Sequence, residues 1–137
     1  MGNKTTPSEN EWIVMEVLWE NGESMTASEI IEKLDGIKPA SPKTIRVLIN
    51  RLLKKEIINF RVDPDDARVY HYFPVKTREE CLEEKSDRFL NSYFKGNPLG
   101  MVAAFVENNR FTKEQIDELI GILRSANDAA QGGGRDL

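Results

Sequence analysis

Apolar residues recur at helical spacing in three segments of the first 55 residues, and each segment begins with a capping signal. The first follows the capping box Ser8-Glu9-Asn10-Glu11 and is predicted to end near Asn21-Gly22. The second follows the capping box Thr26-Ala27-Ser28-Glu29 and is predicted to end at Gly36. The third follows Ser41-Pro42, an N-cap serine with proline in the first turn. The pattern therefore predicts three short helices.

The pattern then changes from a helical period to runs of β-branched and aromatic residues. These runs are Ile57 to Val62 and Val69 to Phe73, and the turn cluster Asp63-Pro64-Asp65-Asp66 lies between them. A strand, an acidic turn and a second strand predict a β-hairpin.

Three further helical segments follow the hairpin. They begin at Thr77-Arg78-Glu79-Glu80, at Asn97-Pro98 and at Thr112-Lys113-Glu114-Gln115, of which the first and last are capping boxes. The last helix is predicted to end near Ser125. Residues 126–137 include a glycine run and are expected to fray or to be a disordered tail.

The order of elements predicts a mostly α-helical (α+β) chain in two parts. Residues 1–76 are expected to form a winged helix-turn-helix domain that binds DNA. Residues 77–125 are expected to form a three-helix dimerisation domain, because three amphipathic helices of this length bury too little surface alone and usually find a partner chain.

Composition narrows the class of protein. Hydrophobic residues make up 39% of the chain and charged residues 31%, which excludes intrinsic disorder. No apolar run approaches the roughly 20 residues of a membrane span, and the N-terminus lacks the apolar segment of a signal peptide, so we expect a cytoplasmic protein without membrane insertion. The single cysteine, Cys81, fits a reducing compartment, and packing on a helix face is favoured over a redox switch.

Charge is distributed unevenly along a chain whose net charge is −4. The segment from Glu9 to Asp35 contains eight acidic residues and one basic residue, whereas the segment from Lys38 to Arg61 contains seven basic residues and one acidic residue. Such a basic block is a candidate footprint for a polyanion. A solvated helix face with acidic neighbours is an equal alternative on charge alone.

The third segment carries the candidate recognition helix, because the second helix of a helix-turn-helix enters the major groove. Its exposed face presents Arg46, Val47 and Asn50, which suit guanine, a thymine methyl and adenine in that order. For Asn50, an exposed polar residue that contacts no DNA is an equal alternative. The N-terminus of the helix favours phosphate through its free amides and dipole. The candidate DNA-binding residues of this segment are Ser41, Lys43, Thr44, Arg46, Val47, Asn50, Arg51 and Lys54.

The far end of this helix and the hairpin supply candidate phosphate contacts. Arg51, Lys54 and Lys55 are interpreted as phosphate clamps, which set affinity without specifying sequence. For the two lysines, complementation of the helix dipole is an equal alternative. Arg61 and Arg68 flank the acidic tip of the wing and can reach the DNA backbone. The aspartates of that tip argue against deep groove insertion, so we expect a weak wing contact.

The residues do not indicate catalytic chemistry. His71 is the only histidine and lies among aromatic strand residues, where cross-strand packing is favoured over catalysis. The chain has no glycine-rich phosphate loop, nucleophile elbow or HExxH pattern. The pairs Glu79-Glu80 and Glu83-Glu84 fit a solvated helix face better than a cation site. We therefore expect no enzyme activity, no catalytic residue, no metal and no cofactor.

Several segments are more specific than a generic winged helix. They are Glu11 to Trp19, Ser41-Pro42-Lys43-Thr44-Ile45-Arg46, Phe89 to Gly96 and Val102 to Glu107. Through them the chain, from about Ser8 to Leu123, resembles the penicillinase-repressor family of the BlaI, MecI and CopY type.

The resemblance implies a homodimeric repressor of a resistance or stress operon. Each winged domain would bind half of a dyad operator on double-stranded DNA, and the C-terminal helices of two chains would interlock. It marks Lys43, Thr44, Arg46 and Val47 as base and backbone contacts. It assigns the dimer interface to Phe89, Leu90, Tyr93, Phe94, Leu99, Val102, Phe105, Val106, Ile116, Leu119, Ile120 and Leu123.

The chain also departs from the family pattern. The resistance branch often carries threonine in place of Val47 and an aromatic residue in place of Ala40, so operator preference is expected to differ. In that branch a membrane sensor protease cuts an Asn-Phe bond, and the matching bond here, Ala104–Phe105, lacks the asparagine. The copper-sensing branch carries a Cys-x-Cys pair, whereas Cys81 stands alone. The alternative function is a winged-helix protein–protein interaction module without sequence-specific DNA binding, which the acidic first helices favour.

Overall fold

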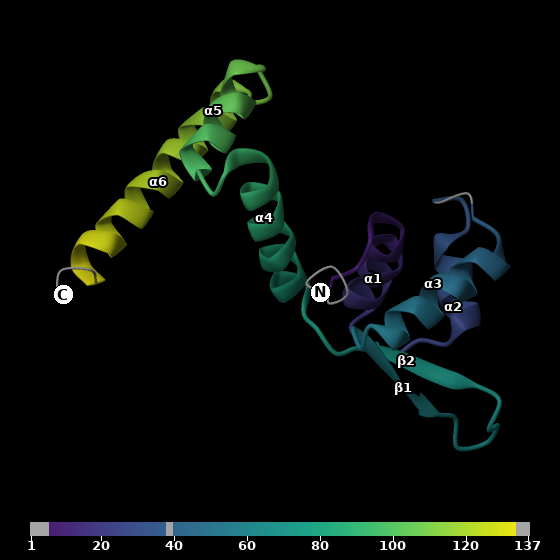
Figure 1. The fold of residues 1–137 in the computed structure, drawn as a ribbon. Helices are drawn as coiled ribbons and strands as arrows, with labels where there is room; N and C mark the ends of the chain where they lie inside the picture. Colours follow the sequence, from purple (N-terminus) through teal and green to yellow (C-terminus); the bar gives the residue numbers. More distant parts are fainter. Residues whose placement is uncertain (1–5, 38–39, 134–137) are drawn as a thin grey trace. The chain divides into compact units, whose positions relative to one another are not determined.

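A computed structural model describes residues 6–37 and 40–133 of the chain (Figure 1). The basic residue Lys38 and the last four residues of the predicted tail lie outside the described residues. The elements in chain order are α1 (Glu9–Asn21), α2 (Ala27–Leu34), α3 (Pro42–Lys54), β1 (Ile58–Val62), β2 (Tyr70–Pro74), α4 (Arg78–Phe94), α5 (Pro98–Glu107) and α6 (Lys113–Gly133). None of the described helices combines the length and apolar character that a membrane span requires.

The predicted capping boxes form as expected. At the start of α1, the Oγ of Ser8 accepts from the amide of Glu11 (3.2 Å), and the Glu11 carboxylate accepts from the amide of Ser8 (2.9 Å). These reciprocal bonds satisfy amides that have no partner within the helix. The same pair of bonds forms at the starts of three other helices, between Thr26 and Glu29, Thr77 and Glu80, and Thr112 and Gln115.

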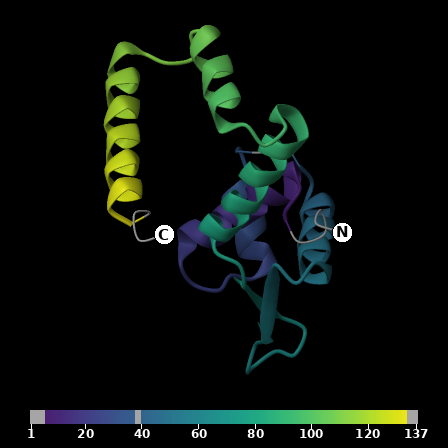
Figure 2. The same ribbon diagram turned by 60° about the vertical axis from the view of Figure 1, so that its left-hand side comes forward.

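The hairpin is confirmed as an antiparallel pair in which Phe60 lies opposite Tyr72. In Figure 2 it extends from the helical part of its unit as a two-stranded ribbon. One additional residue pairs with β2: the Met25 amide donates to the Tyr72 carbonyl (2.9 Å), and the Tyr72 amide donates to the Met25 carbonyl (2.7 Å). This bridge ties the segment before α2 to the base of the hairpin.

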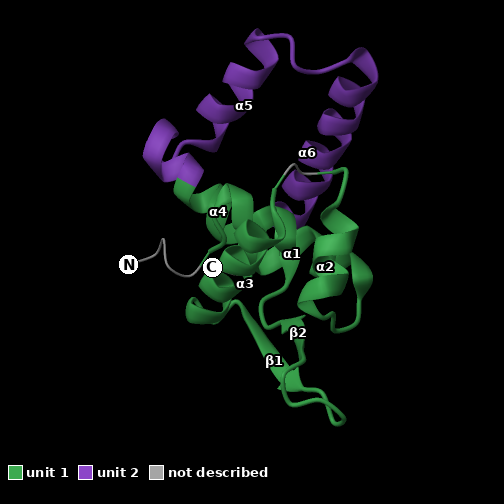
Figure 3. Ribbon diagram, turned by 90° about the vertical axis from the view of Figure 1, so that its right-hand side faces the viewer, with its two compact units in different colours: residues 1–88 green, residues 89–137 purple. Residues whose placement is uncertain are grey.

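Residues 1–88 form one compact unit around a single core (Figure 3). Most of its fully buried residues come from α1, α2, α3 and β1, among them Met15, Leu18, Ile30, Ile45 and Leu52. Cys81 of α4 is also completely buried in this core, which confirms the packing interpretation of the cysteine. The start of α4 therefore belongs with the winged part, so the first unit extends beyond the sequence-based boundary after residue 76. Three helices followed by a two-stranded wing make this unit a winged helix-turn-helix.

Residues 89–137 form the second unit. None of the described side chains from residue 89 to 131 is buried. The last helix continues to Gly133, so the predicted helix end near Ser125 is wrong. The reason is local, because Ala126, Ala129, Ala130 and Gln131 have favourable helix propensities that outweigh the following glycines.

Candidate nucleic-acid interface

Helix α3 has one buried face and one solvent face. Ile45, Leu48, Ile49 and Leu52 pack into the core. The polar and basic positions on the opposite side are free of the core, as the helical spacing predicts. All the predicted DNA-binding residues of this segment are exposed, namely Ser41, Lys43, Thr44, Arg46, Val47, Asn50, Arg51 and Lys54.

The N-terminus of α3 is organised by Ser41. Its Oγ accepts from the amide of Thr44 (3.1 Å) and lies 2.9 Å from the Thr44 hydroxyl. The Oγ of Ser41 therefore caps α3, and the helix N-terminus keeps its positive dipole end in solvent. Val47 lies on the same solvent face and is 41% exposed. An apolar side chain in that position has no partner within the core.

The far end of α3 differs from the sequence-based interpretation. The Nζ of Lys55 lies 2.6 Å from the Oε1 of Glu11 and donates to the Thr6 carbonyl at 3.3 Å. Glu11 is 2% exposed, so Lys55 neutralises a buried carboxylate. The interpretation of Lys55 as a phosphate clamp is wrong, whereas its neighbour Lys54 stays exposed.

Arg46 of α3 and Arg68 of the wing line the same pocket. The pocket has a volume of about 260 Å³ and is open to solvent. Its other lining residues are Thr26, Ala27, Ser28, Val69, Tyr70 and Tyr72. Two guanidinium groups beside a helix start form a site suited to a backbone phosphate. Sequence reasoning missed Tyr70 and the start of α2 here, because contacts between distant segments bring them together, among them the Met25–Tyr72 bridge.

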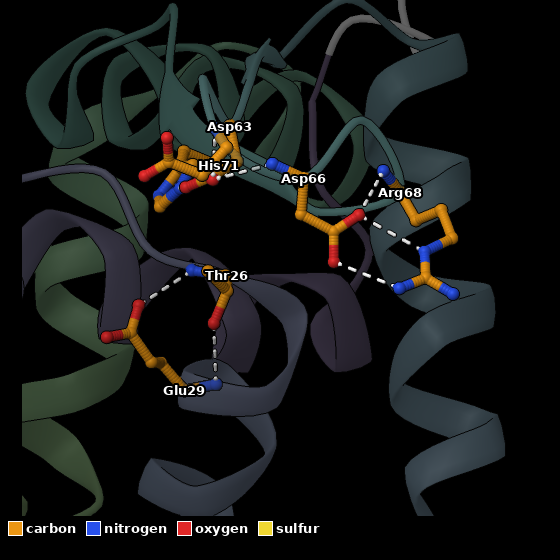
Figure 4. A network of polar contacts seen from close by, with 7 residues as sticks. Thr26, Glu29, Asp63, Asp66, Arg68 and His71 are labelled. Carbon is orange, nitrogen blue, oxygen red and sulfur yellow. Dashed lines mark hydrogen bonds and ion pairs between the residues drawn. The ribbon is translucent and has the colours of Figure 1, made fainter.

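The tip of the wing is held together by its own acidic residues (Figure 4). Asp63 accepts from the amides of Asp65 (2.9 Å) and Asp66 (3.1 Å), and a ring nitrogen of His71 lies 2.7 Å from its other oxygen. The hydrogen bond with His71, followed by the amide of Asp65, lowers the pKa of Asp63 below its ordinary value. His71 thus has a structural role, through a hydrogen bond to the tip rather than through aromatic packing.

The two arginines of the wing have different surroundings. Arg68 donates from Nε (3.1 Å) and Nη2 (3.3 Å) to the carboxylate of Asp66, and this bond lowers the pKa of Asp66. Arg61 instead lies over the ring of Phe73, with 4.8 Å between the guanidinium carbon and the ring centroid, a cation–π contact. It lines a separate hollow with Trp19, so the structure does not bring it together with Arg46 and Arg68.

No cluster of metal-binding side chains is found among the described residues. Two acidic residues of α4 are engaged with nearby groups: Glu80 closes the cap of its own helix, and Glu84 pairs with Lys76 at 3.1 Å.

Comparison with known proteins agrees with this geometry. A sequence model of the penicillinase repressor family matches residues 7–125. The chain is 36% identical over 116 residues to the penicillinase repressor of Bacillus licheniformis, covering 85% of this chain and 88% of that protein. It is 36% identical over 124 residues to the methicillin resistance regulatory protein MecI of Staphylococcus aureus (strain N315), covering 90% and 98% of the two chains.

Among solved structures, the YusO protein from Bacillus subtilis is similar with a TM-score of 0.50 and 18% identity. The match covers 90% of this chain and 77% of that protein. At this identity the similarity concerns the fold alone, and it agrees with the winged-helix architecture described above. The family match and the two relatives carry the assignment: the chain belongs to the penicillinase repressor family.

Proposed function

We propose that the chain is a DNA-binding transcriptional repressor and not an enzyme. The observation that carries the proposal is the exposed face of α3, where basic and polar side chains gather on a helix whose other face is buried. The relatives are named as a penicillinase repressor and a methicillin resistance regulator, which supports control of a resistance or stress operon. Such a repressor acts in the cytoplasm, where its DNA partner lies.

In this proposal α3 enters the major groove and the wing contacts the backbone. Lys43, Thr44, Arg46, Val47 and Asn50 contact base edges or adjacent phosphates near the N-terminal half of the helix. The remaining contacts are to phosphate and come from Ser41, Arg51, Lys54, Arg61 and Arg68. Arg46 and Arg68 line one pocket, so a single phosphate can bridge the recognition helix and the wing.

We further propose that two copies of the chain form a homodimer that binds a dyad operator. The second unit supports this, because it has large apolar side chains and no buried side chain among its described residues. Tyr93 is 74% exposed and Leu99 is 75% exposed. Phe89, Phe105, Val106, Ile116, Ile120 and Leu123 are also exposed, and Leu90, Phe94, Val102 and Leu119 are partly buried.

Release from DNA is proposed to involve the second unit. A membrane sensor protease is a candidate partner, with Ala104–Phe105 as the candidate cleavage bond. The Ala104 carbonyl accepts from the amide (3.2 Å) and the side chain (2.8 Å) of Asn108 at the end of α5. Because the Ala104–Phe105 peptide bond lies within a capped helix, its cleavage would require that the end of α5 unwinds first.

A gel-shift titration tests the DNA proposal directly. The full chain is titrated against fragments of its own promoter region and against a scrambled duplex, at low and at physiological salt. Tight, saturable binding to one fragment at physiological salt supports a sequence-specific repressor. Equal, salt-labile binding to every duplex would contradict sequence-specific recognition. No binding to any duplex would favour a protein–protein interaction module instead.

A further inference from the structure

The winged unit has a further open hollow, here called the Val75 hollow, which none of the candidate DNA contacts lines. Its volume is about 460 Å³, which is within the usual range of small-molecule sites. Its lining comes from α1, the end of β2, the segment that joins β2 to α4, and the start of α4, all within the first unit. Trp19 and Pro74 also line the neighbouring hollow of Arg61, but Arg61 does not line the Val75 hollow.

One wall of the Val75 hollow is the indole of Trp19, whose position is fixed. The indole N–H donates to the carbonyl of Lys76 at 2.9 Å. The ring of Trp12 contacts the indole edge-on, with 5.2 Å between the ring centroids and 73° between the ring planes. Aromatic pairs favour this geometry. An aromatic surface that is already held in place loses little conformational entropy when a ligand packs against it.

A second wall is apolar and comes from the end of β2 and the residue after it. Pro74 and Val75 line the hollow, and Val75 is 55% exposed although it is a large apolar residue. The amides of Val75 (2.8 Å) and Lys76 (3.3 Å) both donate to the carbonyl of Ile57, which holds this segment in place. The hollow therefore offers fixed apolar surface from two separate segments of the chain.

Both positive groups that line the hollow have carboxylate partners. The Nε of Arg78 donates to one oxygen of Glu16 (3.0 Å), and its Nη2 donates to the other (3.3 Å). The Nζ of Lys76 donates to the Oε1 of Glu84 at 3.1 Å. Each pair is electrically neutral, so the two cations bring little net positive charge to the hollow.

Two carboxylates of the hollow are not balanced in this way. Glu20 of α1 and Glu79 of α4 line it and are exposed, and neither forms a hydrogen bond or an ion pair with another described residue. The segment from Glu9 to Asp35, which contains α1, adds eight acidic residues against one basic residue. A negative field of this kind attracts cations and repels anions. The charge of the hollow therefore favours a cationic ligand and disfavours a phosphate.

We propose that the Val75 hollow binds an organic cation with a flat apolar body. The charged nitrogen of the ligand lies against the indole of Trp19 and near the carboxylates of Glu20 and Glu79, while its apolar body covers Pro74 and Val75. Tryptophan is the best aromatic partner of a cation, and a neighbouring carboxylate strengthens the attraction. The site uses no candidate DNA contact, so the inference does not depend on the proposed repressor function.

The test is a titration of the full chain with benzyltrimethylammonium, followed by NMR of the indole N–H groups. The chain has two tryptophans, and the signal that disappears in Trp19→Phe is assigned to the hollow. Benzyl alcohol and benzenesulfonate are the matched neutral and anionic probes. We expect a saturable shift of the Trp19 signal with a dissociation constant on the order of 1 mM for the cation. The neutral and anionic probes should bind at least about threefold more weakly.

Two double variants test the role of the carboxylates. Glu20→Gln, Glu79→Gln removes both charges from the hollow and keeps side-chain size. Glu32→Gln, Asp35→Asn is the matched control, because it removes two exposed charges that do not line the hollow. The first variant should weaken binding of benzyltrimethylammonium by about fivefold, and the control should weaken it by less than about twofold. Backbone amide spectra that match the wild type verify the fold of both variants.

Three results would overturn the inference. They are a Trp19 signal that does not shift saturably with the cation, equal affinity for all three probes, and equal weakening of cation binding in the two double variants. Equal weakening would mean that the acidic surface as a whole, and not the hollow, attracts the cation. The comparison of probes uses the wild-type chain alone, so it decides the inference even if a variant does not fold.

Discussion

The ammonium group of Lys55 lies 2.6 Å from the carboxylate of Glu11, although 44 residues separate them in the sequence. The carboxylate is almost completely buried and also accepts from the amide of Ser8. One side chain thus caps α1 and anchors the end of the recognition helix α3. The basic end of α3 therefore contains two lysines with different roles, Lys55 in the fold and Lys54 in solvent.

The different roles of these lysines predict different effects of the same substitution. Lys55→Met should lower the free energy of unfolding by about 3 kcal/mol, because it leaves a buried carboxylate without its partner. Lys54→Met should change it by about 0.5 kcal/mol or less and should weaken DNA binding. Urea unfolding followed by circular dichroism measures the free energy of unfolding of both variants. Equal stability of the two variants would contradict the structural role of Lys55.

Arg46 is predicted to contribute to sequence discrimination. Arg46→Ala should weaken operator binding by about tenfold or more, because a good contact to a base edge is worth about 1–3 kcal/mol. Lys54→Ala should weaken binding to all duplexes alike and reduce the salt slope by about 1. Gel shifts with operator and scrambled duplexes at several salt concentrations separate the two patterns. Wild-type affinity in Arg46→Ala would show that α3 does not read the operator through this residue.

The ion pair between Asp66 and Arg68 is predicted to limit the contribution of the wing. Asp66→Asn should release the guanidinium of Arg68 for a phosphate and raise DNA affinity by about threefold, since an exposed ion pair is weak and is readily exchanged for another partner. The salt slope should increase by about 0.9. Asp65→Asn is the matched control, because it removes the same charge from the tip without releasing Arg68. If the two variants bind equally, net charge alone explains the gain.

The wing tip is predicted to lose stability in acid. Because the hydrogen bond with His71 lowers the pKa of Asp63 below 3.8, the folded tip favours the carboxylate. Its contribution is complete above the unfolded pKa and is lost as the pH falls through the lower folded pKa. His71→Phe should move the pKa of Asp63 upward. Carbon-13 NMR of the Asp63 carboxyl, titrated from about pH 6 to about pH 2, measures this pKa in the wild type and in the variant. An unchanged pKa would exclude His71 as the cause.

The second unit is predicted to hold the dimer through one stripe of α6. Leu123→Asp should produce monomers, because a charge would be buried in the interface at a cost of several kcal/mol. Ile122→Asp is the control: Ile122 is also exposed but lies about 100° away around the helix from Leu123. Sedimentation equilibrium measures the oligomeric state of both variants. Dimers of Leu123→Asp, or monomers of both variants, would place the interface elsewhere.

The helices and the faces of α3 could be predicted from the sequence because their signals are local. A capping box is complete within four residues, as at Ser8 and Glu11, and the buried stripe of α3 follows from the helical period. The same locality explains the error at the end of α6, where glycines outweighed alanines in the interpretation. Local patterns fix helix starts more sharply than helix ends.

The remaining features depend on contacts between distant segments, which no spacing rule identifies. Met25 pairs with Tyr72 as a single residue, too short for a strand pattern. The capping box identifies Glu11 only as a cap residue, and nothing in the sequence pattern indicates that Lys55, 44 residues later, is its second partner. The shared pocket of Arg46 and Arg68 exists only once the hairpin is docked beside α2.

Hydroxyl-radical footprinting of the promoter fragment with the wild-type chain and with Arg46→Ala tests the central claim most directly. The account predicts two protected patches related by a dyad and separated by a whole number of helical turns, with two chains bound per site. Both patches should disappear in Arg46→Ala at the concentration that saturates the wild type. A single asymmetric patch, uniform protection, or full protection by Arg46→Ala would contradict a homodimer that reads its operator through α3.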